Sequence, residues 1–111
     1  MKEPVEVATE IEKKIHEIES ACKRLQGMAT EKAATSAQFA VAFGEQLMDL
    51  HKNKACPAAI MRDVAKGRCV KELKAMDYAE AAYKLQTELL QSLRAELNGW
   101  QSYNRYLDIK V

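Results

Sequence analysis

The fold is decided at residues 50–59, which read LHKNKACPAA. A long stretch with helical spacing of apolar residues lies on each side of this segment. Pro57 within it lacks the backbone N–H that a continuing helix requires, so we expect the chain to fold back here. We predict an all-α protein, a long antiparallel helical hairpin with helices over about residues 5–53 and 69–108 and a short connecting helix over about residues 57–66.

The first long stretch carries apolar or small residues at alternating intervals of three and four, which is typical of a helix with one packed seam. Pro4 suits the first helical turn, and Glu6 and Glu10 favour the positive end of the helix dipole. The predicted seam consists of Ile11, Ile15, Ile18, Cys22, Leu25, Ala29, Ala33, Ser36, Phe39, Phe43, Leu47 and Leu50.

The second long stretch has a similar seam, which starts after Gly67, a residue that we expect to cap the short helix. Asn98-Gly99 is a turn signal, and a break there with a separate tail is the alternative to a continuous helix. The apolar spacing continues past this dipeptide, so we predict continuity. The seam consists of Val70, Leu73, Met76, Ala79, Tyr83, Gln86, Leu90, Leu93, Leu97, Trp100, Asn104 and Leu107.

A fold-back at Cys56 predicts which residues meet across the hairpin. Positions whose numbers add up to about 122 or 123 would form layers in which a large residue faces a small one. The predicted layers place Gln86 opposite Ser36 and Leu93 opposite Ala29, and the remaining ones are Leu50 with Leu73, Phe43 with Ala79, Phe39 with Tyr83, Leu25 with Leu97, Cys22 with Trp100 and Ile15 with Leu107.

A second apolar stripe runs along both helices near the fold-back. In a lone two-helix hairpin this stripe would remain exposed to solvent. Exposing it would cost roughly 25 cal/mol per Å² of apolar surface. We predict that it forms the interface of a homodimer, a four-helix bundle with coiled-coil packing. The alternative is that the short 57–66 helix covers it. The stripe consists of Ala34, Ala37, Val41, Gly44, Met48, Ala75, Tyr78, Ala82, Leu85 and Leu89.

The 111 residues predict one domain, residues 1–111, with a net charge of only +1. Residues 52–74, however, carry seven Lys or Arg against two acidic residues. This basic cluster could bind a nucleic-acid backbone or a nucleotide phosphate, and the alternative is a solvated tip. Its members are Lys52, Lys54, Arg62, Lys66, Arg68, Lys71 and Lys74.

The sequence offers no convincing catalytic or metal-binding motif, so we expect a protein that is not an enzyme and has no cofactor. His51, Cys56 and Cys69 match no familiar zinc spacing, and no glycine loop suits a phosphate or an oxyanion. Three cysteines do not suggest a disulfide framework. The longest apolar run, residues 39–43, is far below the roughly 20 residues that span a bilayer, so we expect a cytoplasmic protein without a membrane partner.

Trp100, Tyr103 and Tyr106 form an aromatic cluster near the far end of the predicted hairpin. Two interpretations remain open. The cluster either closes the core at this end or anchors another protein.

The segments PAAIMRDVAKG (residues 57–67), AEAAYK (79–84) and LRAEL (93–97) resemble a loose family of small helical proteins encoded by bacteriophages and prophages. The similarity covers roughly the second half of the chain. It implies an accessory phage protein in the cytoplasm of a bacterial host, acting in phage DNA metabolism or against a host defence, and it supplies no catalytic residues.

Two functional hypotheses follow. The first is a non-enzymatic, oligomeric helical protein that acts by macromolecular binding, as a phage accessory protein that binds or inhibits a host protein. The alternative is nucleic-acid or nucleotide-phosphate binding through residues 52–74.

Overall fold

The computed structural model describes residues 3–110, which form three α-helices and one short 3-10 helix. These are α1 (Pro4–Asn53), η1 (Ala58–Ile60), α2 (Met61–Arg68) and α3 (Val70–Lys110). The described residues contain no strand, so the predicted all-α fold is confirmed. The second long helix, α3, continues through Asn98 and Gly99, as the apolar spacing indicated.

The first helix ends in a Schellman turn. Lys54 adopts a left-handed conformation with φ of 48°. The N–H of Ala55 donates to the carbonyl of Leu50 at 3.3 Å, and the N–H of Lys54 donates to that of His51 at 3.4 Å. These two bonds satisfy carbonyls that the helix end leaves without partners, so α1 stops here before Pro57.

The end of α2 differs from its prediction. Gly67 lies inside α2 and does not have a positive φ, so the expected glycine cap is wrong. Instead Cys69 ends the helix with φ of −109°, and its N–H donates to the carbonyl of Lys66 at 3.0 Å. A 3-10-type bond of this kind closes a helix without a left-handed residue.

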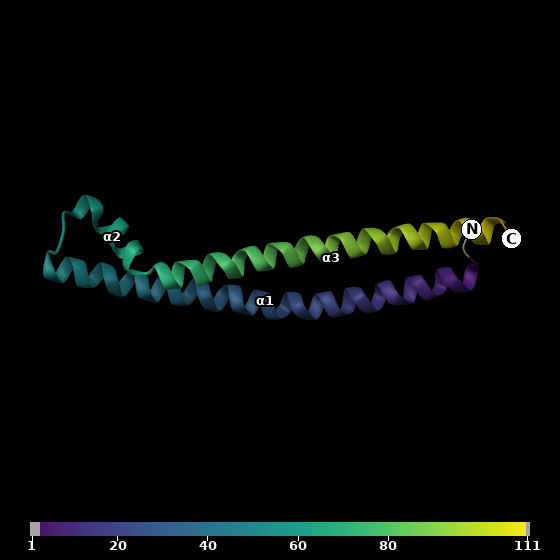
Figure 1. Cartoon of the computed structure of the whole chain (residues 1–111), viewed down its shortest axis with the longest axis horizontal. Helices are drawn as coiled ribbons and strands as arrows, with labels where there is room; N and C mark the ends of the chain where they lie inside the picture. The colour runs from purple at the N-terminus through teal and green to yellow at the C-terminus, as the bar shows by residue number, and fades with distance from the viewer. Residues whose placement is uncertain (1–2, 111) are drawn as a thin grey trace. The chain divides into compact units, whose positions relative to one another are not determined.

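The chain forms two compact units, and each long helix contributes to both. Unit 1 consists of Met1–Gly27 and Lys84–Val111, and unit 2 is Met28–Tyr83. Within each unit, a segment of α1 and a segment of α3 run antiparallel (Figure 1). Unit 2 also contains the connection with η1 and α2.

The core of unit 1 is a small cluster of buried residues. Ala21, Leu90 and Leu93 are buried together, with Ile18 and Leu25 packed against them. Gln86 is also buried, and its side-chain amide donates to the carbonyl of Ala21 at 3.1 Å. This bond compensates the cost of burying the amide.

The core of unit 2 lies where α2 packs on the end of α1. Leu50 and Ala65 are fully buried, and Met61 is nearly so. Phe43 and Leu47 pack against this cluster. The short helix therefore covers the last turns of α1.

The predicted register between the two long helices is wrong. Gln86 bonds to Ala21, whereas its expected partner Ser36 is exposed, and Leu93 packs with Ala21 while Ala29 is exposed. The reason is the position of α2. Because α2 returns along the end of α1, α3 begins opposite Ala42 and Glu45, well before α1 ends, and Lys71 and Glu72 of α3 line a groove with these two residues.

The predicted seam of α3 is confirmed at every position except Val70, which is exposed. On α1 the seam is wrong at Ile15, which is 40% exposed, and in its middle, where Ala29, Ala33 and Ser36 are exposed. The residues that face α3 there are Met28, Lys32 and Thr35. Thr35 can be buried because its hydroxyl donates to the carbonyl of Glu31 at 2.9 Å. The ammonium of Lys32 lies 4.8 Å from the centre of the Tyr83 ring.

Candidate functional site

Unit 2 exposes apolar side chains along one face. Val41 and Met48 on α1 are 61% and 75% exposed, and Tyr78 on α3 is 80% exposed. Helical spacing of three and four residues places further small residues beside them. We call this surface the apolar face, and it consists of Ala34, Ala37, Val41, Met48, Ala75 and Tyr78.

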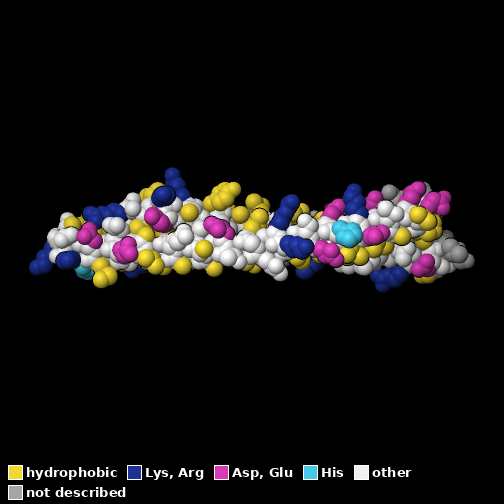
Figure 2. Space-filling view, turned by 90° about the horizontal axis from the view of Figure 1, so that it is seen from below, with side chains coloured by type: hydrophobic (Ala, Val, Ile, Leu, Met, Phe, Trp, Pro, Cys, Tyr) yellow, Lys and Arg dark blue, Asp and Glu magenta, His cyan; other side chains and the backbone are white. Residues whose placement is uncertain are grey.

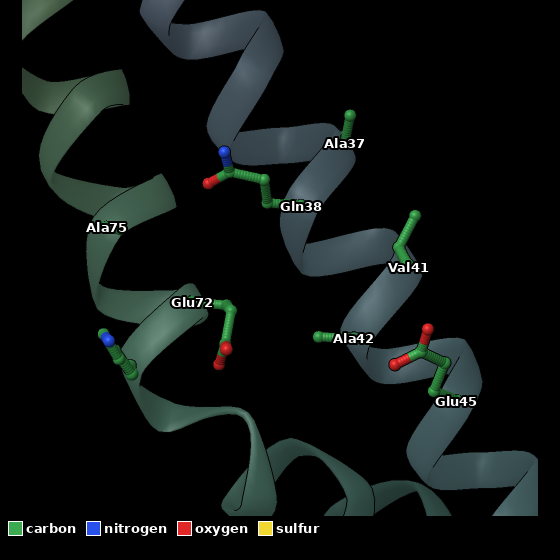
Figure 3. Close-up of a pocket in the computed structure, with 8 residues that line it drawn as sticks. Ala37, Gln38, Val41, Ala42, Glu45, Glu72 and Ala75 are labelled. Atoms are coloured by element: carbon green, nitrogen blue, oxygen red, sulfur yellow. The ribbon is translucent and has the colours of Figure 1, made fainter.

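A groove of about 530 Å³ opens on this face between α1 and α3. Ala37, Val41 and Ala75 line it together with Lys71 and Glu45. In Figure 3, Ala42 points toward α3, whereas Ala37 and Val41 point away from it. The groove therefore has apolar and polar side chains between the helices and exposed side chains along its outer rim.

A second hollow of about 340 Å³ shares Ala75 with the groove. Tyr78 and Ala82 line it from α3, and Met28 and Glu31 line it from α1. The concave apolar surface thus continues along unit 2 on the same side of the helix pair.

The other predicted interface residues occupy different environments. Gly44 and Ala82 are half-buried, and in unit 1 the leucines Leu85 and Leu89 are 66% and 45% exposed. The short helix does not cover the stripe, since Met61 of α2 packs with Leu50 instead. The alternative in which this helix shields the stripe within one chain is therefore wrong.

All seven residues of the basic cluster are exposed in unit 2. Figure 2 shows dark blue side chains gathered around the turn that joins α1 to α2. Arg68 is the one member that forms an ion pair among the described residues, with Asp49 at 3.0 Å, and it also donates to Gln46. The guanidinium of Arg62 lies 5.3 Å from the centre of the Phe43 ring. The remaining ammonium groups are available to a polyanion.

The aromatic cluster lies in unit 1. The rings of Trp100 and Tyr103 meet edge to face with centroids 6.3 Å apart, and those of Tyr103 and Tyr106 stack at the same separation. Trp100 and Tyr103 are half-buried, and Tyr106 is exposed. Two rings of the cluster are therefore partly buried, and the ring of Tyr106 is exposed.

The cysteines and His51 do not form one site. His51 is exposed, Cys56 packs against the Leu50 cluster, and Cys69 is 1% exposed. Burial raises the pKa of the Cys69 thiol, and the nearby carboxylates of Glu72 and Glu45 raise it further. No group of three metal-ligating side chains occurs within residues 3–110.

No family model, curated protein or solved structure matches the chain. The resemblance to phage proteins therefore depends on the three quoted segments alone. None of the described helices is long and apolar enough to cross a bilayer.

One cluster of charged residues in unit 1 was not predicted from the sequence. Lys14 of α1 pairs with Glu96 of α3 and, at 3.2 Å, with Glu17. The hydrogen bonds to Glu96 and then Glu17 raise the pKa of Lys14. The spacing of Lys14 and Glu17 was a visible signal, but the contact with Glu96 required the correct register.

Proposed function

We propose that the chain is a non-enzymatic helical protein that self-associates through the apolar face and acts by binding another macromolecule. The supporting observation is the exposure of Val41, Met48 and Tyr78 on one side of unit 2. Exposed apolar side chains that gather on one side of a soluble protein can mark an interface. The assembled form is a four-helix bundle over this face.

The total surface of the chain supports self-association. The chain exposes 8060 Å². A folded monomer of its mass would expose about 6200 Å² by the usual scaling of surface with size. The excess is well above the roughly 800 Å² that each partner buries in a standard interface. The chain therefore exposes more surface than a compact monomer does, which leaves area for a partner to cover.

The partner class follows from the resemblance to phage and prophage proteins. We propose that the assembly is a phage accessory protein that binds or inhibits a host protein in a bacterial cytoplasm. Tyr106, which is exposed and stacks on Tyr103, is the candidate anchor for such a partner.

Sedimentation velocity of the whole chain tests self-association. We expect a dimer or larger species at micromolar concentration. Val41→Glu combined with Tyr78→Glu should give a monomer, because it places charges in the apolar face. Val5→Glu is the matched control, since Val5 is 76% exposed outside the face, and it should leave the oligomer intact. A wild-type monomer with full helical circular dichroism would contradict the proposal.

Nucleic-acid or nucleotide-phosphate binding is a second candidate, favoured by the exposed ammonium groups of the basic cluster. Fluorescence anisotropy with a labelled DNA duplex should show affinity that falls with salt, because bound phosphates release counterions. Lys52→Glu with Lys66→Glu should abolish it, whereas Lys13→Glu with Lys23→Glu, exposed lysines of unit 1, should not. Equal affinity of both variants would remove this candidate.

A further inference from the structure

The charges around the apolar face indicate how a second copy is oriented on it. We infer that α1 of each copy packs over α3 of its partner, so that the two α1–α2 turns lie at the same end of the dimer. This inference rests on the proposed self-association. It assigns an orientation that exposure of the face alone does not give.

Apart from Glu72, each helix contributes one sign of charge to the face. On α1, Glu45 lies one turn beyond Val41 and lines the groove, and Glu31 lines the adjoining hollow with Tyr78. On α3, Lys71 lines the groove, and Lys74 lies one turn before Tyr78. The outer rim is thus acidic along α1 and basic along α3.

Three other charges near the face do not change this pattern. The Glu72 side chain points from α3 into the space between the helices (Figure 3). Asp49 is paired with Arg68, and Lys52 lies at the last turn of α1, past the groove. The charges that a second copy meets are therefore those of Glu31, Glu45, Lys71 and Lys74.

Two arrangements with two-fold symmetry bring the apolar faces together. If α1 packs on the partner's α1, the copies point in opposite directions, acidic residues meet acidic residues and lysines meet lysines. If α1 packs on the partner's α3, Glu45 meets Lys71 at the same level of the groove. Like charges at an interface disfavour association and opposite charges favour it, so the second arrangement is preferred.

The same-end arrangement has a consequence for the basic cluster. Symmetry places two copies of Lys52, Lys54, Arg62 and Lys66 beside each other at one end of the dimer. A polyanion would then meet twice the positive charge that one chain presents.

Charge exchange measured by sedimentation equilibrium tests the orientation. Glu45→Lys alone and Lys71→Glu alone should each weaken dimerisation about tenfold, and the double variant should restore it. In the opposite-end arrangement Glu45 does not meet the partner's Lys71, so the single variants would not weaken the dimer in this way and the double variant would show no rescue. Glu80→Lys, an exposed charge of α3 outside the face, is the matched control and should change nothing.

A distance measurement provides an independent test. A spin label at Ala59→Cys, in a background with the three native cysteines changed to alanine, should show an inter-copy distance below roughly 30 Å in the same-end dimer. Copies pointing in opposite directions would separate the labels by on the order of 40 Å or more, at 1.5 Å per helical residue. A dimer with the longer distance overturns the inference and leaves self-association intact. A monomeric wild type overturns both.

Discussion

At the scale of single residues, Lys54 is the most constrained position of the backbone. Its φ of 48° is a left-handed conformation that lysine adopts at a cost and glycine adopts freely. The conformation persists because it completes the Schellman turn at the end of α1. The local strain at Lys54 is therefore offset by hydrogen bonds to two carbonyl groups at the end of α1.

Lys54→Gly should raise the free energy of unfolding by about 1 kcal/mol, since glycine removes the strain and keeps both backbone hydrogen bonds. Urea denaturation followed by circular dichroism measures it. Lys52→Gly is the control, because this exposed residue is helical and glycine should lower stability there by a similar amount. Equal destabilisation by both changes would contradict the left-handed turn.

On α3 the burial of single residues could be read from the sequence, whereas their contact partners could not. The spacing of α3 placed Gln86 on the seam, and its side chain is buried there. Its partner is the carbonyl of Ala21 and not Ser36, because the amide N–H donates to whichever acceptor the register brings within reach. Thr35 was missed for a related reason. A hydroxyl that bonds to its own helix can be buried without any apolar signal.

At the scale of the elements, helix α2 determines how the long helices align. Its buried residues Met61 and Ala65 fit against Leu50, and this contact fixes where α3 can begin. The sequence located the helix, but its amphipathic pattern did not say on which helix it would pack. The predicted register was wrong because the packing of α2 on α1 could not be read from the sequence.

Met61→Ala should lower the free energy of unfolding by about 2–3 kcal/mol, because it removes buried methylene groups and leaves a cavity beside Leu50. Amide hydrogen exchange should show the loss first in α2 and in the last turns of α1. Ile60→Ala, an adjacent truncation at a residue that is 46% exposed, should cost less than about 1 kcal/mol. Similar costs for the two variants would argue against the packing of α2 on α1.

The candidate surfaces were only partly predictable at this scale. Exposure of Val41, Met48, Tyr78 and Leu85 agrees with a stripe outside the hairpin seam, because spacing alone separates two faces of a helix. The ion pair of Arg68 with Asp49 could not be foreseen, since it joins α2 to α1 across the connection. It leaves Arg68 less available to a ligand than its sequence neighbours Lys66 and Lys71.

At the scale of the whole molecule, one group among the described residues of each compact unit binds its proton more tightly when folded. Cys69 in unit 2 has a pKa raised above its ordinary value of 9.0, and Lys14 in unit 1 has a pKa raised above 10.5. The unfolded chain releases these protons at lower pH than the folded chain. Their contribution to stability is therefore complete below the unfolded values and is lost as pH rises through the folded values.

Stability should consequently decrease as pH rises above 9.0, first through Cys69 and then, above 10.5, through Lys14. Urea unfolding in a series of buffers from about pH 8 to about pH 11 measures the decrease. In Cys69→Ala the decrease should begin only near the higher value. Stability that rises over this range would show that neither group is held in its protonated form.

The packing of α2 on the end of α1 also bears on which insertions and deletions the chain tolerates. Residues 54–60 are exposed apart from Cys56, which is half-buried, and they follow the end of α1 and precede the α2 contact that sets the register. One or two residues gained or lost between the Schellman turn at Lys54 and Ala55 and the start of η1 change the length of the connection and not the α2 contact, so natural variation in length can accumulate at that point. A single residue inserted within α2 would instead rotate everything after it by about 100° relative to the contact with Leu50, so this short helix is where the chain should be least permissive to a change of length.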